Sequence, residues 1–207
     1  KLQVGELPAL PYKNSMRLIF LTLILFSLSL MSYESDLPKC SKKYDNNWHN
    51  CQGTYVASDG GVYKGEFFNA MMNGVGTYEK DGAFYEGTFK NWQFDGKGVY
   101  RFASGAVYTG DFLRGFNHGK GIMKFYDSDG YYEGDYLVSK KHGQGKEVFE
   151  NGSYYEGSFK FDKRDGQGKY VWADGSTYNG QWVGSNMSGF GRYVSSTYTY
   201  EGTYNLD

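Results

Sequence analysis

The chain has 207 residues and a formal net charge of −1, with a pI near 6.4, so its overall charge gives no sign of a nucleic-acid-binding protein. Its length fits one or two domains. Its apolar content is aromatic rather than aliphatic, with 21 Tyr and 15 Phe, and 30 Gly stand against 3 Pro. This composition favours strands and turns over helices.

The N-terminal part of the chain includes a segment, residues 16–35, with the pattern of a targeting signal. Position 1 is Lys, and Met16 followed by Arg offers a better start, so residues 1–15 are interpreted as an upstream or non-native extension. An apolar run covers residues 18–31 and is shorter than the ~20 residues of a membrane span. Small and polar residues follow it, as they do at the end of a secretory signal peptide.

Residues 16–35 are therefore predicted to be a signal peptide that is cleaved between Ser29 and Ser35. The alternative is a short membrane anchor formed by residues 18–31. With cleavage, we expect a protein exported to a periplasm, a cell surface or the medium.

Two cysteines, Cys40 and Cys51, follow this segment, and residues 36–52 are interpreted as a cysteine-bounded N-terminal cap. An even number of cysteines in an exported chain favours one disulfide, which would stabilise the start of the fold by roughly 3 kcal/mol. A metal site or reactive thiols are the competing interpretation. They have little support, because His49 is the only nearby imidazole and no second cysteine pair completes four ligands.

From Gly53 onward the sequence is periodic, with two signatures that alternate every 22 to 24 residues. The first, Tyr-x-Gly-x-aromatic, starts at Tyr63, Tyr85, Tyr108, Tyr132, Tyr155, Tyr178 and Tyr200. The second, Gly-x-Gly, falls at Gly74/Gly76, Gly96/Gly98, Gly119/Gly121, Gly143/Gly145, Gly166/Gly168 and Gly189/Gly191. After it comes a turn signal, at Asp81-Gly82, Ser104-Gly105, Asp129-Gly130, Asn151-Gly152 and Asp174-Gly175. Such pairs supply the positive φ angles of hairpin turns.

Strand geometry explains the first signature. In an extended strand Tyr155, Gly157 and Phe159 share one face, while Glu156 and Ser158 share the other. Glycine weakens a strand, so its repeated use needs a compensating gain. We expect an aromatic ring to lie flat across a neighbouring strand where no Cβ stands, so that rings bury apolar area without a second layer.

These signatures resemble the MORN repeat over nearly the whole span from Gly53 to Tyr204. The resemblance implies an all-β fold, in which residues 53–207 form an elongated, twisted, single-layer antiparallel sheet of consecutive MORN β-hairpins. Phe94 and Phe116 depart from the family pattern, in segments expected to be loops. We expect these departures to change the shape of the loops that contain them but not the fold.

Catalytic motifs are missing from the sequence. There is no nucleophile elbow, P-loop or Ser/His/Asp signature, and the Gly-x-Gly pairs precede strand patterns rather than helices. His118 and His142 occupy the same place in successive repeats, which is ordinary repeat chemistry. Glu86, Glu133 and Glu156 also recur at one position and are expected to face solvent. We therefore expect no enzyme activity, no cofactor and no bound metal.

Basic residues gather in the segments between the two signatures. The candidates for contact with anions or an anionic lipid surface are Arg114, Lys140, Lys141, Lys160, Lys163 and Arg164. Lipid contact has been proposed for the family that the sequence resembles, and each basic residue near a charged membrane contributes about 1 kcal/mol. The alternative is a solvated edge, because the charges are sparse and partly offset by nearby aspartates.

The aromatic face is a second candidate surface, as a groove for a peptide or a glycan. Its candidate residues are Tyr85, Phe89, Tyr108, Phe112, Tyr155 and Phe159. The alternative is that these rings are simply the hydrophobic core.

The C-terminal strand is a third candidate surface, because the chain stops within a repeat. Tyr200, Gly202 and Tyr204 have no Gly-x-Gly strand after them, and no proline or lysine protects this edge. We expect any homodimer to form through a two-fold contact of this strand.

Taken together, the sequence predicts an exported, non-enzymatic scaffold or protein-interaction module with a protein partner that the sequence does not identify. A repeat protein that binds an anionic lipid surface or a glycan is the alternative. An accessory domain of an enzyme is less well supported.

Overall fold

The computed structural model describes residues 35–41 and 43–205. The chain divides into two units, residues 1–36 and 37–207, and the repeats lie in the second. The predicted signal peptide at residues 16–35 lies outside the described residues except for Ser35, and the alternative anchor at residues 18–31 and the extension at 1–15 lie wholly outside them. Within the described residues, no helix has the length and hydropathy needed to cross a membrane.

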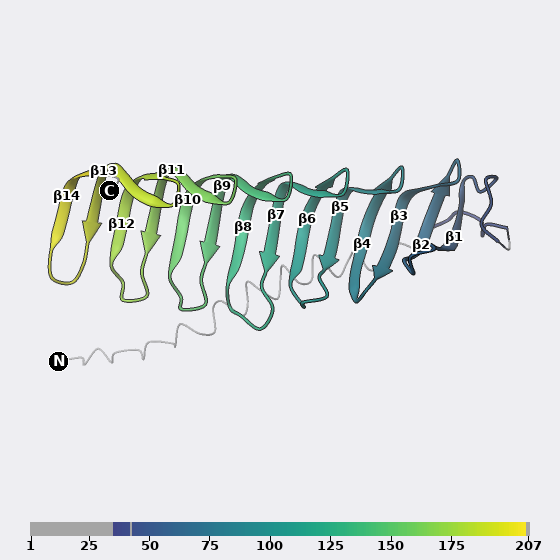
Figure 1. Ribbon diagram of the computed structural model, residues 1–207, viewed down its shortest axis with the longest axis horizontal. Coiled ribbons are helices and arrows are strands. Elements are labelled where there is room, and N and C mark those ends of the chain that lie inside the picture. The colour runs from purple at the N-terminus through teal and green to yellow at the C-terminus, as the bar shows by residue number, and fades with distance from the viewer. Residues whose placement is uncertain (1–34, 42, 206–207) are drawn as a thin grey trace, which may run out of the picture. The chain divides into compact units, whose positions relative to one another are not determined.

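Fourteen strands form one antiparallel sheet, in which each strand pairs with its neighbours in the sequence (Figure 1). The predicted fold, an all-β single-layer sheet of consecutive hairpins, is confirmed. The strands are β1 (Cys51–Val56), β2 (Val62–Phe68), β3 (Met71–Lys80), β4 (Ala83–Lys90), β5 (Gln93–Arg101), β6 (Val107–Leu113), β7 (Phe116–Lys124), β8 (Tyr131–Leu137), β9 (Lys140–Val148), β10 (Tyr154–Lys160), β11 (Lys163–Val171), β12 (Thr177–Val183), β13 (Asn186–Val194) and β14 (Thr199–Tyr204).

The two sequence signatures alternate along the sheet. Even-numbered strands carry Tyr-x-Gly-x-aromatic, and odd-numbered strands from β3 onward carry Gly-x-Gly. The register sets glycine opposite glycine, as in the pair Gly65 with Gly76, and in many strand pairs tyrosine opposite tyrosine, as in Tyr63 with Tyr78. In the middle of the sheet, Met123 and Glu147 take the place of the second tyrosine. In β1 the sequence Cys51-Gln52-Gly53 takes the place of Gly-x-Gly, so the sheet begins with the second half of a repeat.

Alternation along each strand gives the sheet two different faces. One face, the aromatic face, carries the even-strand tyrosines, the facing glycine pairs such as Gly134 and Gly145, and the aromatic residue that ends each even-strand signature, and it holds almost all of the buried residues. The other, the polar face, carries mainly charged and polar side chains such as Glu133, Lys146, Glu156 and Lys169. A single layer therefore has its core on one side only.

The turns differ between the two edges of the sheet (Figure 1). Along one edge, the turn edge, every even strand passes to the next odd strand through a two-residue turn. These turns lie at residues 69–70, 91–92, 114–115, 138–139, 161–162 and 184–185. The segments expected to be loops are thus tight turns flanked by strands, and most of the basic candidates belong to the strands.

Both residues of each turn on this edge have positive φ angles, and four of the six turns contain no glycine. In the turn after β8, for example, Val138 has φ 49° and Ser139 has φ 58°. This conformation is costly for residues other than Gly, Asn or Asp, and most of all for a β-branched one. The intrinsic backbone preferences of these residues therefore do not explain why the turns adopt this conformation.

Hydrogen bonds to the preceding hairpin hold these turns in place. The Ser139 N–H donates to the Asn117 carbonyl (2.9 Å), and the Asn117 N–H donates back to Ser139 Oγ (3.1 Å). Asp162 and Lys141 form the same reciprocal pair, through N to O (2.9 Å) and N to Oδ1 (2.8 Å). Each turn is therefore stacked on the turn before it.

The opposite edge, the loop edge, carries the turn signals predicted from the sequence. Gly82, Gly105, Gly152 and Gly175 have positive φ angles, as expected, while Gly130 does not. Only Asp81-Gly82 makes a two-residue turn. The other loops span four to six residues, such as 102–106 and 125–130.

Candidate functional site

Six tyrosines, one from each even strand from β2 to β12, lie completely buried on the aromatic face. Each ring covers a pair of facing glycines. A Cβ built on Gly145 would lie 2.4 Å from the Tyr132 hydroxyl oxygen, and one built on Gly134 would lie 2.5 Å from it. The Tyr132 hydroxyl donates to the Asp135 carbonyl (3.0 Å). The glycines thus make room for the rings, as the sequence predicted.

Edge-to-face contacts link these tyrosines along the sheet. Tyr85 meets Phe89 of its own strand and Phe112 of the next even strand, with centroid distances of 5.0 Å in both pairs. Such pairs contribute about 0.5–1.5 kcal/mol beyond the area that they bury. The six groove candidates are all part of this packing and at most 4% exposed: Tyr85, Phe89, Tyr108, Phe112, Tyr155 and Phe159. The structure places them in the core, which was the alternative interpretation of the sequence.

Burial also changes the acid–base behaviour of the tyrosines. It raises the pKa of Tyr155 to about 12, although the nearby Arg164 guanidinium acts in the opposite direction. The pKa values of Tyr63, Tyr85 and Tyr108 are raised further, again mainly by burial. These hydroxyls stay protonated at physiological pH, so they act as hydrogen-bond donors to the backbone.

Cross-strand pairs cover the polar face. Lys97 lies 2.6 Å from Asp111, and Lys120 lies 2.7 Å from Asp135. Asp135 also accepts a hydrogen bond from the Gln144 backbone N–H (2.9 Å), beside the register shift that follows Gly134. Burial alone would raise the pKa of Asp135, but the Lys120 ammonium and the Gln144 amide outweigh it and lower this pKa.

The six basic candidates are divided between two locations. Arg114, Lys140, Lys160 and Lys163 are exposed at the turn edge, and Lys140 pairs with Asp162 (2.7 Å). The other two candidates lie over the aromatic rings.

Lys141 forms an ion pair with Glu147, and its Nζ lies 5.3 Å from the centre of the Tyr132 ring. Arg164 lies 4.6 Å from the centre of the Trp182 ring and donates a hydrogen bond to the Ser185 carbonyl (3.3 Å). Both side chains therefore make cation–π contacts. They are less available to bind an anion than the four basic side chains that are exposed at the turn edge.

Apolar side chains stand exposed between the basic residues of the turn edge. Leu113, Phe116, Val138 and Phe161, called here the turn stripe, are 44–54% exposed. Leu113 and Phe116 flank the turn at residues 114–115, while Val138 and Phe161 belong to the next two turns, at 138–139 and 161–162. Of these four residues, only Phe116 departs from the repeat pattern in the sequence. Apolar residues at several neighbouring turn positions, where polar residues are usual, were the signal that could have found the rest.

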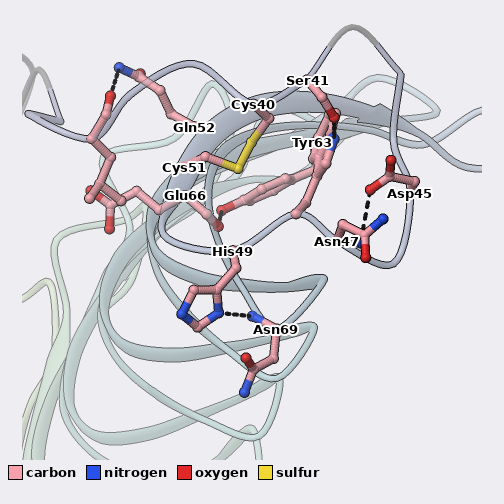
Figure 2. The surroundings of a disulfide bond; sticks show 12 residues. Cys40, Ser41, Asp45, Asn47, His49, Cys51, Gln52, Tyr63, Glu66 and Asn69 are labelled. Carbon is pink, nitrogen blue, oxygen red and sulfur yellow. Dashed lines mark hydrogen bonds between the residues drawn. A yellow bond between two sulfur atoms is a disulfide. The ribbon is translucent and has the colours of Figure 1, made fainter.

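At the N-terminal end, the predicted Cys40–Cys51 disulfide is present (Figure 2). The bond closes a loop of the residues between Cys40 and Cys51, and Cys51 is the first residue of β1. Trp48, in this loop, is 4% exposed and packs edge-to-face on Phe67 at 4.8 Å. The Tyr44 ring also packs against the first repeat, and its hydroxyl donates to the Ala70 carbonyl (2.8 Å). The predicted cap at residues 36–52 thus comprises a segment before the sheet, residues 37–50, and the first two residues of β1.

Among residues 35–41 and 43–205, β14 pairs with β13 alone. The candidate edge residues Tyr200, Gly202 and Tyr204 lie on it. Tyr200 is 44% exposed, whereas its equivalents in the six preceding even strands are fully buried.

The histidines do not form a metal centre. His49 Nδ1 accepts a hydrogen bond from the Asn69 N–H (3.3 Å), and His142 packs against the Phe161 ring at 5.0 Å. Among residues 35–41 and 43–205, no cluster of three or more His, Cys, Asp or Glu side chains could hold a metal ion.

A comparison of the sequence with known families agrees with these structural features. They are the alternating register, the buried tyrosines and the glycine pairs. The model of the MORN repeat matches six consecutive stretches, at residues 63–82, 85–107, 108–130, 132–154, 155–177 and 178–200. The chain belongs to the MORN repeat family. Its predicted family membership is thereby confirmed.

Comparison with curated proteins and solved structures adds little to this membership. No curated protein matches the sequence. Among solved structures, a similar chain is the SAS-4 (dCPAP) TCP domain of Drosophila melanogaster, solved in complex with a proline-rich motif of Ana2 (dSTIL). The two share 13% identity with a TM-score of 0.41, and the match covers 84% of the MORN protein and 99% of the TCP domain.

Proposed function

We propose that this MORN protein is an exported, non-enzymatic scaffold that holds a protein partner along its turn edge. The observation that carries this proposal is the turn stripe, where Leu113, Phe116, Val138 and Phe161 are exposed on consecutive turns. Contiguous exposed apolar side chains in a soluble protein commonly mark an interaction surface. Stacking of the turns gives this surface a fixed spacing.

Charge at the turn edge indicates what kind of partner fits. Arg114, Lys160 and Lys163 form no ion pair with any described residue, so they leave positive charge beside the turn stripe. A partner segment with apolar and acidic side chains would complement both properties.

A capture experiment with matched variants tests the turn stripe. The unmodified protein and a Leu113→Ser/Phe116→Ser/Phe161→Ser variant would be used as bait for proteins from the native source. A Phe125→Ser/Tyr126→Ser variant changes exposed aromatic residues of the loop edge instead and serves as the control. We expect the partner to bind the unmodified protein and the control but not the stripe variant. Equal capture by all three would refute the proposal.

An anionic lipid surface is the second candidate partner. Exposed rings next to basic side chains at the turn edge favour it, since apolar insertion and charge attraction act together at membranes. Flotation with phosphatidylserine vesicles should then carry the protein upward. A Lys140→Glu/Lys160→Glu/Lys163→Glu variant should stay in the dense fraction, and so should the unmodified protein with phosphatidylcholine vesicles.

Export remains part of the proposal, and the Cys40–Cys51 disulfide supports it, because such bonds persist in oxidising compartments. Mass spectrometry of the protein from its native source would test this directly. We expect a mature chain that starts between Ser29 and Ser35 and lacks free thiols. A chain that retains residues 18–31 would support the membrane-anchor alternative.

We also propose that a homodimer forms through β14, with Tyr200, Gly202 and Tyr204 at a two-fold contact. Half-exposed Tyr200 and the unpaired edge of the strand support this arrangement. Sedimentation should show dimers for the unmodified protein and monomers for a Thr203→Pro variant, because proline removes a donor from the edge. Persistence of dimers in that variant would contradict the contact.

A further inference from the structure

The polar face changes in character along the sheet. One row of side chains crosses its strands, formed by the middle residue of each Gly-x-Gly signature and the residue that follows the glycine of each even-strand signature. In the middle of the sheet this row consists of ion pairs, Lys97 with Asp111 and Lys120 with Asp135. From β9 to β13 the row carries no charge, and its residues are Gln144, Ser158, Gln167, Gln181 and Phe190.

Phe190 is the aromatic exception in this row. The same position in the preceding odd strands from β3 onward holds Val75, Lys97, Lys120, Gln144 and Gln167. The Phe190 side chain is 61% exposed, and it contacts no other ring among residues 35–41 and 43–205. It therefore adds nothing to the aromatic core and presents an apolar surface to solvent.

An open hollow lies beside Phe190, across the green-to-yellow strands β11 to β14 (Figure 1). Its volume is about 340 Å³, within the range of about 300–1,000 Å³ that is usual for small-molecule sites. The side chains that line it are all exposed, so a ligand can enter directly from solvent. They are Gln167, Asn179, Gln181, Phe190, Arg192 and Glu201.

Polar groups in this hollow are available to a ligand. The side chains of Gln167 and Asn179 form no hydrogen bond with any residue that the structure describes. Each of these amides offers a donor and an acceptor side by side. Arg192 Nε lies 3.6 Å from Glu201 Oε2, so the two charges offset each other. The lining thus favours neither an anion nor a cation.

A neutral sugar has the properties that complement this lining. Adjacent hydroxyl groups of a pyranose ring can pair with amide, carboxylate and guanidinium groups, because each of these planar groups presents two polar atoms at once. The C–H groups on one side of a pyranose form an apolar patch, which packs on an aromatic side chain. Phe190 supplies the ring, and Gln167 and Asn179 supply unpaired amides beside it.

The uncharged row sets the length of ligand that fits. Gln144 in β9 and Phe190 in β13 are four strand spacings apart, about 19 Å at about 4.8 Å per spacing, close to the length of four linked sugar residues. Beyond Gln144 the row returns to the ion pair of Lys120 with Asp135. A sugar chain that crosses the strands thus meets uncharged side chains over about this length.

We propose that the polar face binds a neutral oligosaccharide, with one sugar ring stacked on Phe190 and the chain running across the strands toward Gln144. Gln167 and Asn179 hydrogen-bond to hydroxyls of the sugar in the hollow. No residue of the turn stripe lines the hollow, so sugar binding is independent of the proposed protein partner.

Calorimetric titration of the unmodified protein tests this proposal. The probes are two series of neutral oligosaccharides, built from glucose and from N-acetylglucosamine, with two to six residues in each chain. For at least one series, we expect the affinity to rise up to about four residues and then to level off. The series that binds identifies the kind of sugar. If neither series binds at its solubility limit, the proposal is overturned.

Substitutions at Phe190 test the role of the ring. Phe190→Leu keeps an apolar side chain but removes the ring, so the affinity should fall by about tenfold or more, whereas Phe190→Tyr should retain it within about twofold. Tyr126→Ala removes a ring that is 70% exposed at the loop edge and should leave the affinity unchanged. Equal affinities of Phe190→Leu and the unmodified protein would contradict the proposal. Circular dichroism would check that each variant keeps the fold.

Nuclear magnetic resonance locates the bound sugar. During titration with the tetrasaccharide that binds, the side-chain amide signals of Gln167 and Asn179 should shift. The amide signal of Gln93, an exposed residue at the turn edge, should stay in place. Shifts at Gln93 without shifts at Gln167 and Asn179 would put the sugar elsewhere and overturn the assignment of the hollow. Tighter binding of an acidic oligosaccharide, such as oligogalacturonate, would contradict the neutral class of ligand.

Discussion

The aromatic face and the polar face are built by the same fourteen strands, yet they depend on their side chains in different ways. On the aromatic face, each of the six fully buried tyrosines covers a facing pair of glycines, and a Cβ on either glycine would collide with its ring. On the polar face, the position after the signature glycine holds Asp111, Asp135 or Ser158 with no change in the fold. Stability is thus concentrated on one face, and the other is free to vary with function.

Adding one methyl group at a glycine pair should have the largest effect. In Gly134→Ala the new Cβ would lie 2.6 Å from the Gly145 Cα and from the Gln144 carbonyl oxygen, which are backbone atoms. We expect a loss of about 3 kcal/mol in the free energy of unfolding, measured in urea. The control, Gly152→Ala on the loop edge, meets no atom within 4 Å but has φ +82°, and should cost about 1 kcal/mol. Equal losses would contradict the view that close packing at the glycine pair sets the cost.

Alkaline pH should have the second-largest effect, because it destabilises the aromatic face. Burial raises the folded-state pKa of the tyrosines above the unfolded value of 10.0, so their contribution is complete below pH 10.0 and is lost as pH rises from there through the folded-state pKa. Each tyrosine that ionises only on unfolding lowers stability by about 1.4 kcal/mol per pH unit. Urea unfolding at several pH values, with tyrosinate absorbance as the probe, should show a steep loss above about pH 10. A stability that stays level through this range would refute the prediction.

Acid should affect the polar face more mildly. The lowered pKa of Asp135 stabilises the fold above the unfolded pKa, and this contribution is lost as pH falls through the folded value, below about pH 4. Because Asp135 is partly exposed, we expect about 1 kcal/mol or less. In an Asp135→Asn variant, the loss between neutral pH and pH 3 should shrink by that amount. An unchanged acid profile would show that the carboxylate contributes nothing.

Removal of one exposed ion pair should have the smallest effect. Lys97 is 2.6 Å from Asp111 but remains mostly exposed, so Lys97→Ala should change the free energy of unfolding by about 0.5 kcal/mol or less. Differential scanning calorimetry at low and high salt would measure it. A loss as large as that of Gly134→Ala would mean that the polar face also carries the fold.

Much of this arrangement could be predicted from sequence, because strand alternation is a local rule. The rule assigned Tyr155, Gly157 and Phe159 to one face and Glu156 and Ser158 to the other, and the burial pattern agrees. Strand order followed from the hairpin repeat. The disulfide followed from cysteine number and an expected export route.

Features that depend on neighbouring hairpins could not be predicted in this way. Val138-Ser139 and Phe161-Asp162 have no turn signal, and contacts with the preceding turn are what stabilise their positive φ angles. Arg164 looked like a free charge in the sequence, but a tryptophan from the next repeat lies under it. The groove candidates were correctly assigned to one face, yet only the packing of successive repeats shows that their rings are enclosed.

Stacking of each tight turn on the one before it has a mechanical consequence. Since every hairpin is bonded only to its neighbours, a force that separates the two ends of the sheet acts on these junctions one after another rather than on all at once. The end hairpin, with the fewest bonds, should peel away first and pass the load to the next. Under tension the protein should therefore lengthen in regular steps, one hairpin at a time, at low force. When the force is released, hairpins should add back to the remaining sheet, and the protein should shorten again.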